Sequence, residues 1–229
     1  MLTPTKKKKK QIANLHKQNK RIFLFLYCMA VFIQIAAQNQ DVNSKKMYFQ
    51  GYSGGMMLHT GYLSGGEVNI ADFSEKINVQ GTPFGIGGLL RFHFGKHLRI
   101  GSEGYSSTLH YWKNKSYTSL GWGGLLLDCQ WKINKFTVFA GGTIGGGSLK
   151  NVTILNNVST HSIKENAVYQ KHTVLIAAPF IGMEYAITQR VHLITKIDCI
   201  LNITNKPSDF AIGPRVYAGV VFFHGRKSK

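Results

Sequence analysis

The 229-residue chain is poor in cysteine, in proline and in acidic side chains, and the first shortage excludes two classes of protein. Its 3 Cys are too few for a disulfide scaffold or for the common zinc modules with four ligands. Its mean hydropathy of −0.08 excludes a bundle of membrane helices, each of which needs about 20 apolar residues in a row. A chain of this length can bury a sizeable core in one or two domains.

The shortage of acid gives the chain a formal net charge of +18, since 10 Asp plus Glu face 28 Lys plus Arg. A charge of this size first suggests a nucleic-acid partner. However, 8 of the basic residues lie before position 38, at Lys6–Lys10, Lys17, Lys20 and Arg21. The remaining 20 basic and 10 acidic residues give the rest of the chain a net charge of +10.

Residues 1–37 have the three parts of a secretory signal peptide. The basic region precedes the apolar stretch Ile22–Ile35, and small residues follow it. The apolar stretch is shorter than the ~20 residues that span a bilayer, which favours cleavage, near Ala37, over an uncleaved anchor. We therefore predict an exported protein with a short linker at 38–46, and we expect no nucleic-acid partner.

From Met47 onward the sequence alternates in character every second residue and has no helical period. In the clearest segment, Phe84 and Ile86 share one parity with other apolar residues, while Gly85 and Arg91 share the other. Eight such strands are expected, at about 47–58, 79–94, 98–112, 117–131, 136–146, 173–187, 191–201 and 210–223. Alternation is weakest in the first and fourth strands, where we expect a β-bulge.

The connections between these strands alternate strictly between long and short. Three are tight turns, at 95–97, 133–135 and 188–190, and four are longer, at about 60–77, 113–116, 147–172 and 202–209. All tight turns then lie at one end of the sheet. This arrangement predicts an all-β fold, an antiparallel up-and-down transmembrane β-barrel with short periplasmic turns and longer outer loops.

Alternation alone does not say which parity faces outward, because a soluble lipocalin-like barrel gives the same pattern with inside and outside exchanged. The positions of the aromatic residues favour a membrane barrel, whose two interfaces attract aromatic belts. One predicted belt, beside the tight turns, is Phe92, Phe94, Trp131, Phe136, Tyr185, Phe222 and Phe223; the other, toward the long loops, is Tyr105, Tyr111, Trp112, Tyr117 and Trp122.

The export signal, the hairpins at 92–100 and 185–192 and the closing segment Gly213–Phe223 together resemble the small, OmpA- and OmpX-like outer-membrane β-barrel proteins of Gram-negative bacteria. The resemblance covers about residues 47–223. It implies contact with outer-membrane lipids and lipopolysaccharide, and insertion by the barrel-assembly machinery, which reads a terminal aromatic residue. Here the basic tail 224–229 extends past Phe223, so that signal departs from the usual pattern.

The polar parity carries an unusual number of charges, and buried charges must be paired. We therefore predict an ion-pair network that plugs the lumen, with a narrow polar pore as the alternative. Its members are Arg91, Arg99, Glu103, Glu184, Lys196, Asp198 and Arg215, joined by Asp128 if the fourth strand bulges. A basic periplasmic rim is predicted to meet anionic headgroups, formed by Lys96, Lys132, Lys135 and Arg190 together with Lys45, Lys46, Arg226, Lys227 and Lys229.

The sequence offers no motif for catalysis, cofactor binding or metal binding. The pairs Ser107 with His110 and Ser162 with His161 are the candidates for a lipid-modifying hydrolase, but neither has an orienting acid. His93 and His97 are four residues apart across a turn and are expected to be satisfied imidazoles. The predicted function is structural, adhesive or surface-interacting, with loop 147–172 as a possible ligand contact; a pore, an enzyme and a soluble periplasmic barrel are the alternatives.

Overall fold

The computed structural model describes residues 48–70, 75–111, 116–154, 167–203 and 209–225. The predicted signal peptide, the predicted linker at 38–46 and the end of the basic tail lie outside the described residues. Within the described ranges, no helix has the length and apolar character needed to cross a membrane.

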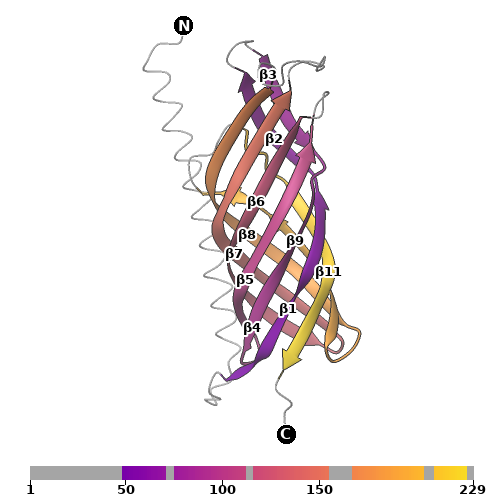
Figure 1. Cartoon of the computed structure of the whole chain (residues 1–229). Helices are drawn as coiled ribbons and strands as arrows, with labels where there is room; N and C mark the ends of the chain where they lie inside the picture. Colours follow the sequence, from indigo (N-terminus) through magenta and orange to yellow (C-terminus); the bar gives the residue numbers. More distant parts are fainter. Residues whose placement is uncertain (1–47, 71–74, 112–115, 155–166, 204–208, 226–229) are drawn as a thin grey trace. The chain divides into compact units, whose positions relative to one another are not determined.

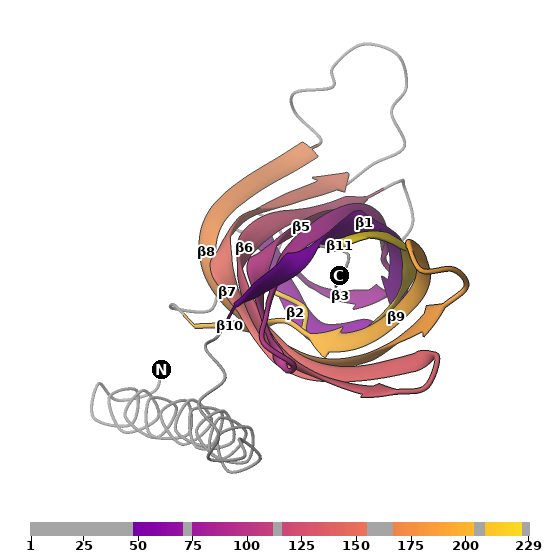
Figure 2. The same cartoon turned by 90° about the horizontal axis from the view of Figure 1, so that it is seen from below.

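Eight long antiparallel strands close into a barrel, as the sequence predicts (Figures 1 and 2). They are β1 (Phe49–Gly61), β4 (Phe84–Phe94), β5 (Leu98–His110), β6 (Tyr117–Ile133), β7 (Phe136–Ile154), β8 (Ala167–Ala186), β9 (Val191–Cys199) and β11 (Pro214–Gly225). Consecutive strands pair from β4 to β9, and β9 pairs with β11. Strand β1 pairs with both β11 and β4, which closes the barrel. The short β10 (Leu201–Asn202) continues β9 along β8 in the same register.

The three tight turns lie where the sequence predicts them, and local chemistry explains each. Gly95 and Asn134 adopt the left-handed conformation, with φ of 56° and 55°, which glycine and asparagine tolerate best. At the third turn, the Thr188 hydroxyl accepts hydrogen bonds from the backbone N–H groups of Arg190 and Val191. These side-chain contacts replace part of the ladder that the turn interrupts.

Two of the segments predicted as long loops, 60–77 and 147–172, contain strands, which corrects that part of the prediction. Residues of the first form a hairpin of β2 (Leu63–Ile70) and β3 (Glu75–Gly81), which is tied to the segment before β11 by the Ser64–Ile212 bridge. In the second, β7 and β8 stay paired out to Ile154 and Ala167. The outer parts of β7 and β8 have polar residues on both faces and lack the apolar alternation that identifies the other strands, whereas β3 keeps it, with Ile77 and Val79 buried and Asn78 and Gln80 exposed.

The apolar parity faces outward, which excludes the inverted arrangement of a soluble lipocalin-like barrel. The contrast is clearest at two consecutive residues of β6: Leu125 is 76% exposed and Leu126 is 1% exposed. Exposed apolar side chains recur on the same parity around the wall, including Met56, Phe84, Ile144, Ile181, Leu193, Ile197, Val216 and Phe222. A continuous apolar exterior of this extent fits a lipid environment.

One of the two predicted bulges is present and the other is not. The pairing of β1 with β4 shifts register between Phe49 and Gly51, as expected for the first strand. In β6 the register to both neighbours is unbroken. Its alternation is hidden because Trp122 and Leu126 are apolar residues on the inner face.

A proline interrupts the barrel at one point. The backbone pairing of β8 with β9 and β10 is interrupted where Pro179 lies opposite Cys199. Proline has no N–H to donate to the neighbouring strand, so the pairing resumes only at Leu201 and Ala177. The break separates β9 from β10 without changing their register.

Candidate functional site: the charged interior of the barrel

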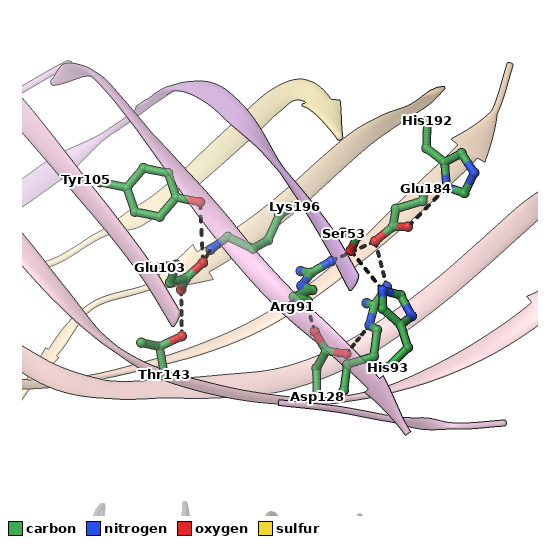
Figure 3. Close-up of polar contacts among 11 residues, drawn as sticks. Ser53, Arg91, His93, Glu103, Tyr105, Asp128, Thr143, Glu184, His192 and Lys196 are labelled. Atoms are coloured by element: carbon green, nitrogen blue, oxygen red, sulfur yellow. Dashed lines mark hydrogen bonds and ion pairs between the residues drawn. The ribbon is translucent and has the colours of Figure 1, made fainter. Parts of the chain in front are cut away.

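All eight predicted lumen residues lie on the inner face of the barrel. They are Arg91 on β4, Arg99 and Glu103 on β5, Asp128 on β6, Glu184 on β8, Lys196 and Asp198 on β9, and Arg215 on β11, and none is more than 4% exposed. Asp128 reaches the interior without the bulge that we expected, because the regular register of β6 already points its even-numbered residues inward. The side chains divide into two groups at different heights along the barrel. Figure 3 labels Arg91, Asp128 and Glu184 of one group and Glu103 and Lys196 of the other.

The group nearer the tight turns consists of two arginines and two carboxylates. The Arg91 Nε lies 3.1 Å from Asp128 Oδ2, and its Nη1 donates to Glu184 Oε1 at 2.6 Å. Arg99 donates from Nε to the other oxygen of Asp128 and from Nη1 to Glu184 Oε1 at 2.7 Å. Each carboxylate therefore contacts both arginines, and each arginine bridges both carboxylates. Figure 3 labels Arg91, Asp128 and Glu184 of this group.

The group nearer the loops joins β5, β9 and β11. Lys196 Nζ donates to Glu103 Oε2 at 2.7 Å and lies 3.9 Å from Asp198 Oδ2. Arg215 donates to Asp198 Oδ1 from Nε and Nη2, both at 3.1 Å. Thr143 donates its hydroxyl to the second oxygen of Glu103 at 2.6 Å, so β7 is also attached to this group.

Aromatic rings fill the space between the charged groups. The guanidinium carbons of Arg91 and Arg99 lie 4.5 and 4.8 Å from the centroid of the Phe139 ring. Lys196 Nζ lies 5.0 Å from the centroid of Tyr105 and 4.5 Å from that of Tyr217. A cation over a ring face is attracted by its electron density, so these rings supply favourable contacts where water is excluded.

Each group has two positive and two negative side chains, so neither carries a net charge. This balance matters because an uncompensated buried charge costs several kcal/mol, whereas a fully paired one is tolerated. Apolar side chains such as Leu126, Ile176 and Ile194 complete the interior and are also fully buried. The described lumen is therefore filled by paired charges and buried apolar side chains.

Several interior residues were not predicted, although their parity identifies them. Tyr105, Trp122 and Phe223 were expected in the aromatic belts, but all three point inward, and the first two are buried. The same is true of Tyr111, while Trp112 lies outside the described residues. The loop-side belt is thus wrong in these members, because each shares the inner parity of its strand. In the turn-side belt, Phe92, Phe136, Tyr185 and Phe222 are exposed as predicted.

At the turn end, imidazoles and a phenylalanine line the interior below the arginines. His93 Nε2 hydrogen-bonds the Ser53 hydroxyl at 2.8 Å, and its ring meets Phe223 edge-on at 5.1 Å. His192 stacks on the same Phe223 at 6.1 Å and has its Nδ1 3.6 Å from Glu184 Oε2. The lumen is narrowed here by side chains from four different strands.

At the loop end, a third polar group lies beyond the lipid-facing part of the barrel. The Tyr111 hydroxyl donates to the Asn151 side-chain oxygen, and the amide of Asn151 donates to Asp209 Oδ2 at 3.4 Å. Burial raises the pKa of the Tyr111 phenol, so it remains a donor at neutral pH. His172 Nε2 lies 3.7 Å from Asp209 Oδ1, which connects β8 to the segment before β11. Above this group, Ile77 and Val79 of the β2–β3 hairpin pack against Leu109 in a small second core.

The predicted rim residues that the structure describes are all exposed. Lys96, Lys132, Lys135 and Arg190 lie in or next to the three tight turns. The other predicted rim residues, Lys45, Lys46, Arg226, Lys227 and Lys229, lie outside the described residues.

The candidate catalytic and metal residues do not come together. Ser107 is buried on the inner face of β5, whereas His110 is exposed on the outer face; Ser162 and His161 lie outside the described residues. His97 hydrogen-bonds the Gln130 carbonyl through Nδ1 at 2.8 Å, whereas His93 hydrogen-bonds the Ser53 hydroxyl. Across the described ranges, no three His, Cys, Asp or Glu residues are grouped to hold a metal ion. Cys129 and Cys199 are free thiols.

Comparison with known proteins supports the fold. No protein-family model and no curated protein matches the chain. Among solved structures, Neisserial surface protein A aligns with a TM-score of 0.50 and 12% identity. The alignment covers 75% of this chain and 95% of the Neisserial chain. The outer-membrane protein OprG of Pseudomonas aeruginosa aligns with a TM-score of 0.50 and 8% identity, covering 79% and 99%. This chain therefore has the fold of the small, eight-stranded outer-membrane β-barrels, and its exposed apolar wall fits that membrane.

Proposed function

We propose that this protein is a non-enzymatic, non-conducting outer-membrane barrel whose role is structural and surface-interacting. The observation that carries the proposal is the packed and electrically balanced interior. Arg91, Arg99 and Arg215 are each at most 1% exposed, although arginine is among the residues most often found in water. A pore needs a hydrated path, and these side chains occupy the space where it would run.

The length of the strands supports a role at the cell surface. A tilted strand crosses a membrane with about 9–11 residues. β7 has 19 residues and β8 has 20, so both extend well beyond the lipid on the loop side. The outer parts of β7 and β8 form a surface of paired strands. Such a surface offers a preformed binding face at lower entropic cost than a flexible loop. Contact of this part with a ligand through residues 147–172 is part of the proposal.

The proposed partners follow from the two ends of the barrel. On the periplasmic side, Lys96, Lys132, Lys135 and Arg190 would meet anionic phospholipid headgroups. On the outer side, the partner would be lipopolysaccharide. Insertion would depend on the barrel-assembly machinery, and β11 offers it a strand that runs two residues past Phe223, to Gly225.

Three measurements test this proposal. The purified protein, reconstituted in a planar bilayer, is expected to give no stepwise conductance, whereas regular single-channel steps would contradict it. A short epitope inserted between β7 and β8 is expected to be labelled by antibody on intact cells. Incubation with lipid A is expected to release no fatty acid; release that is lost on Ser107→Ala substitution would establish an enzyme instead.

A further inference from the structure

The outer faces of β5 to β8 carry a polar surface above the lipid-facing wall, and the strand register arranges it in rows. One row joins Thr108, Ser119, Lys150 and Lys171, one from each strand. We call this the hydroxyl–lysine row. The row below it contains Ser106, Gly121, Ser148 and Thr173, and the row above contains His110, Tyr117, Val152 and Tyr169.

The two lysines of this row are direct cross-strand partners, and both are exposed. Like charges directly opposite each other on a sheet are destabilising. On the outward faces of β5 to β8, as far as the structure describes them, no Asp or Glu offsets them. Five of the chain's 10 acidic residues are instead buried inside the barrel, at Glu103, Asp128, Glu184, Asp198 and Asp209. The lysine pair is therefore complementary to an external anion.

The height of the row indicates which anion it meets. Fourteen residues separate Phe136, at the tight turn, from Lys150 on the same strand. At ~3.4 Å per residue and a tilt of ~40°, this places Lys150 about 36 Å above the turn, beyond an apolar band of about 25 Å. Two rows below the hydroxyl–lysine row the outer face is mainly glycine, with Gly104, Gly123 and Gly146, and below that it becomes apolar at Leu125 and Ile144. The row thus faces sideways, at the level of the headgroups of the outer leaflet.

We propose that the hydroxyl–lysine row binds the phosphorylated sugar headgroup of the glycolipid in the outer leaflet. Lys150 and Lys171 contact its phosphate, and the hydroxyls of Ser119 and Thr173 contact its sugars. Tyr169 is 60% exposed in the row above and offers a ring face to the same saccharide. This inference rests on the proposed location in the outer membrane and adds the residues and the chemical group that are recognised.

The test compares lipid A that carries its phosphates with enzymatically dephosphorylated lipid A. The folded barrel is reconstituted in phosphatidylcholine nanodiscs, and the affinity for each fluorescently labelled lipid A is measured by titration. The variant is Lys150→Gln combined with Lys171→Gln. The matched control, Lys150→Arg combined with Lys171→Arg, keeps both positive charges at the same positions.

Wild type and the control are expected to prefer the phosphorylated lipid. The double glutamine variant is expected to lose about 30-fold in affinity for it, since each lysine near an anionic lipid surface contributes about a fivefold gain. Retained preference in that variant would overturn the proposal, as would equal loss in the control. Wild-type binding of soluble inorganic polyphosphate without any preference for phosphorylated lipid A would also overturn it.

Folding is measured separately on every variant by the gel mobility of unheated and boiled samples. All of them are expected to show the same heat-dependent shift, because the substituted lysines are exposed and far from the interior network. A wild type that shifts and does not conduct, yet does not discriminate the two lipids, would contradict this inference and leave the proposed function standing. A wild type that conducts would contradict the proposed function instead.

Discussion

Replacement of Asp128 by Asn would leave Arg91 and Arg99 with one carboxylate, Glu184, between them. The substitution keeps the shape of the side chain and removes one negative charge from the group nearer the tight turns. In the native barrel, the Nε atoms of both arginines point to Asp128, with Arg91 Nε at 3.1 Å from Oδ2. Because all three side chains are fully buried, the variant holds an uncompensated positive charge away from water.

Removal of one partner from a buried ion pair typically costs about 3–5 kcal/mol. We expect a loss of this size in the free energy of unfolding, measured by urea titration of the barrel in phospholipid vesicles with tryptophan fluorescence and gel mobility as readouts. Addition of Arg99→Gln restores a neutral group and is expected to recover part of the loss. Lys132→Gln, at an exposed position, is expected to stay within about 0.5 kcal/mol of wild type.

A loss below about 1 kcal/mol for Asp128→Asn would refute this reasoning, since it would mean that water reaches the arginines. The same conclusion would follow if the double variant were less stable than the single one by the full cost of a second, independent substitution. The coupling between the two sites is therefore the informative quantity.

Two further predictions concern the inner face and the lipid-facing surface of the barrel. A Cβ atom added at Gly87 would lie 2.2 Å from the Tyr105 ring and from a backbone oxygen, so Gly87→Ala is expected to destabilise the barrel by about 1–3 kcal/mol in the same titration. Gly121→Ala is the control, since nothing lies within 4 Å of its added Cβ, and equal losses would contradict the packed interior. Leu125→Arg places a charge in the lipid-facing wall and is expected to cost about 2–4 kcal/mol. Tyr169→Arg, beyond that wall, is expected to cost little, and a reversed order would place the membrane elsewhere.

The sequence was sufficient to predict the barrel because lipid and lumen impose opposite demands on alternate residues. The parity that contains Phe84 and Ile86 is apolar enough to face lipid, and the other contains Arg91, which fits only an interior or water. The tight turns were equally predictable, since Gly95 and Asn134 occupy the left-handed conformation that their residue types favour. The charges inside were predictable as a set for the same reason.

The partners of those charges were not predictable. Arg91 and Glu184 are 93 residues apart, and their contact depends on the register of every strand between them. The loop side was also misread, because the outer parts of β7 and β8 have polar residues on both faces. β3 was assigned to a loop although its buried Ile77 and Val79 alternate with exposed Asn78 and Gln80. Trp122 and Tyr105 were assigned to a belt by height alone, although their parity, which matches Asp128 and Glu103, indicates the interior.

The central claim, that the apolar parity faces lipid while the charged parity fills the lumen, is tested most directly by spin labels. With Cys129 and Cys199 replaced by Ala, a single label is placed at Leu125→Cys and, in a second protein, at Tyr169→Cys. In phospholipid vesicles, the label at 125 is expected to collide with dissolved oxygen far more often than with a water-soluble nickel complex, and the label at 169 is expected to show the opposite order. Ready access of the nickel complex to position 125 would contradict the claim.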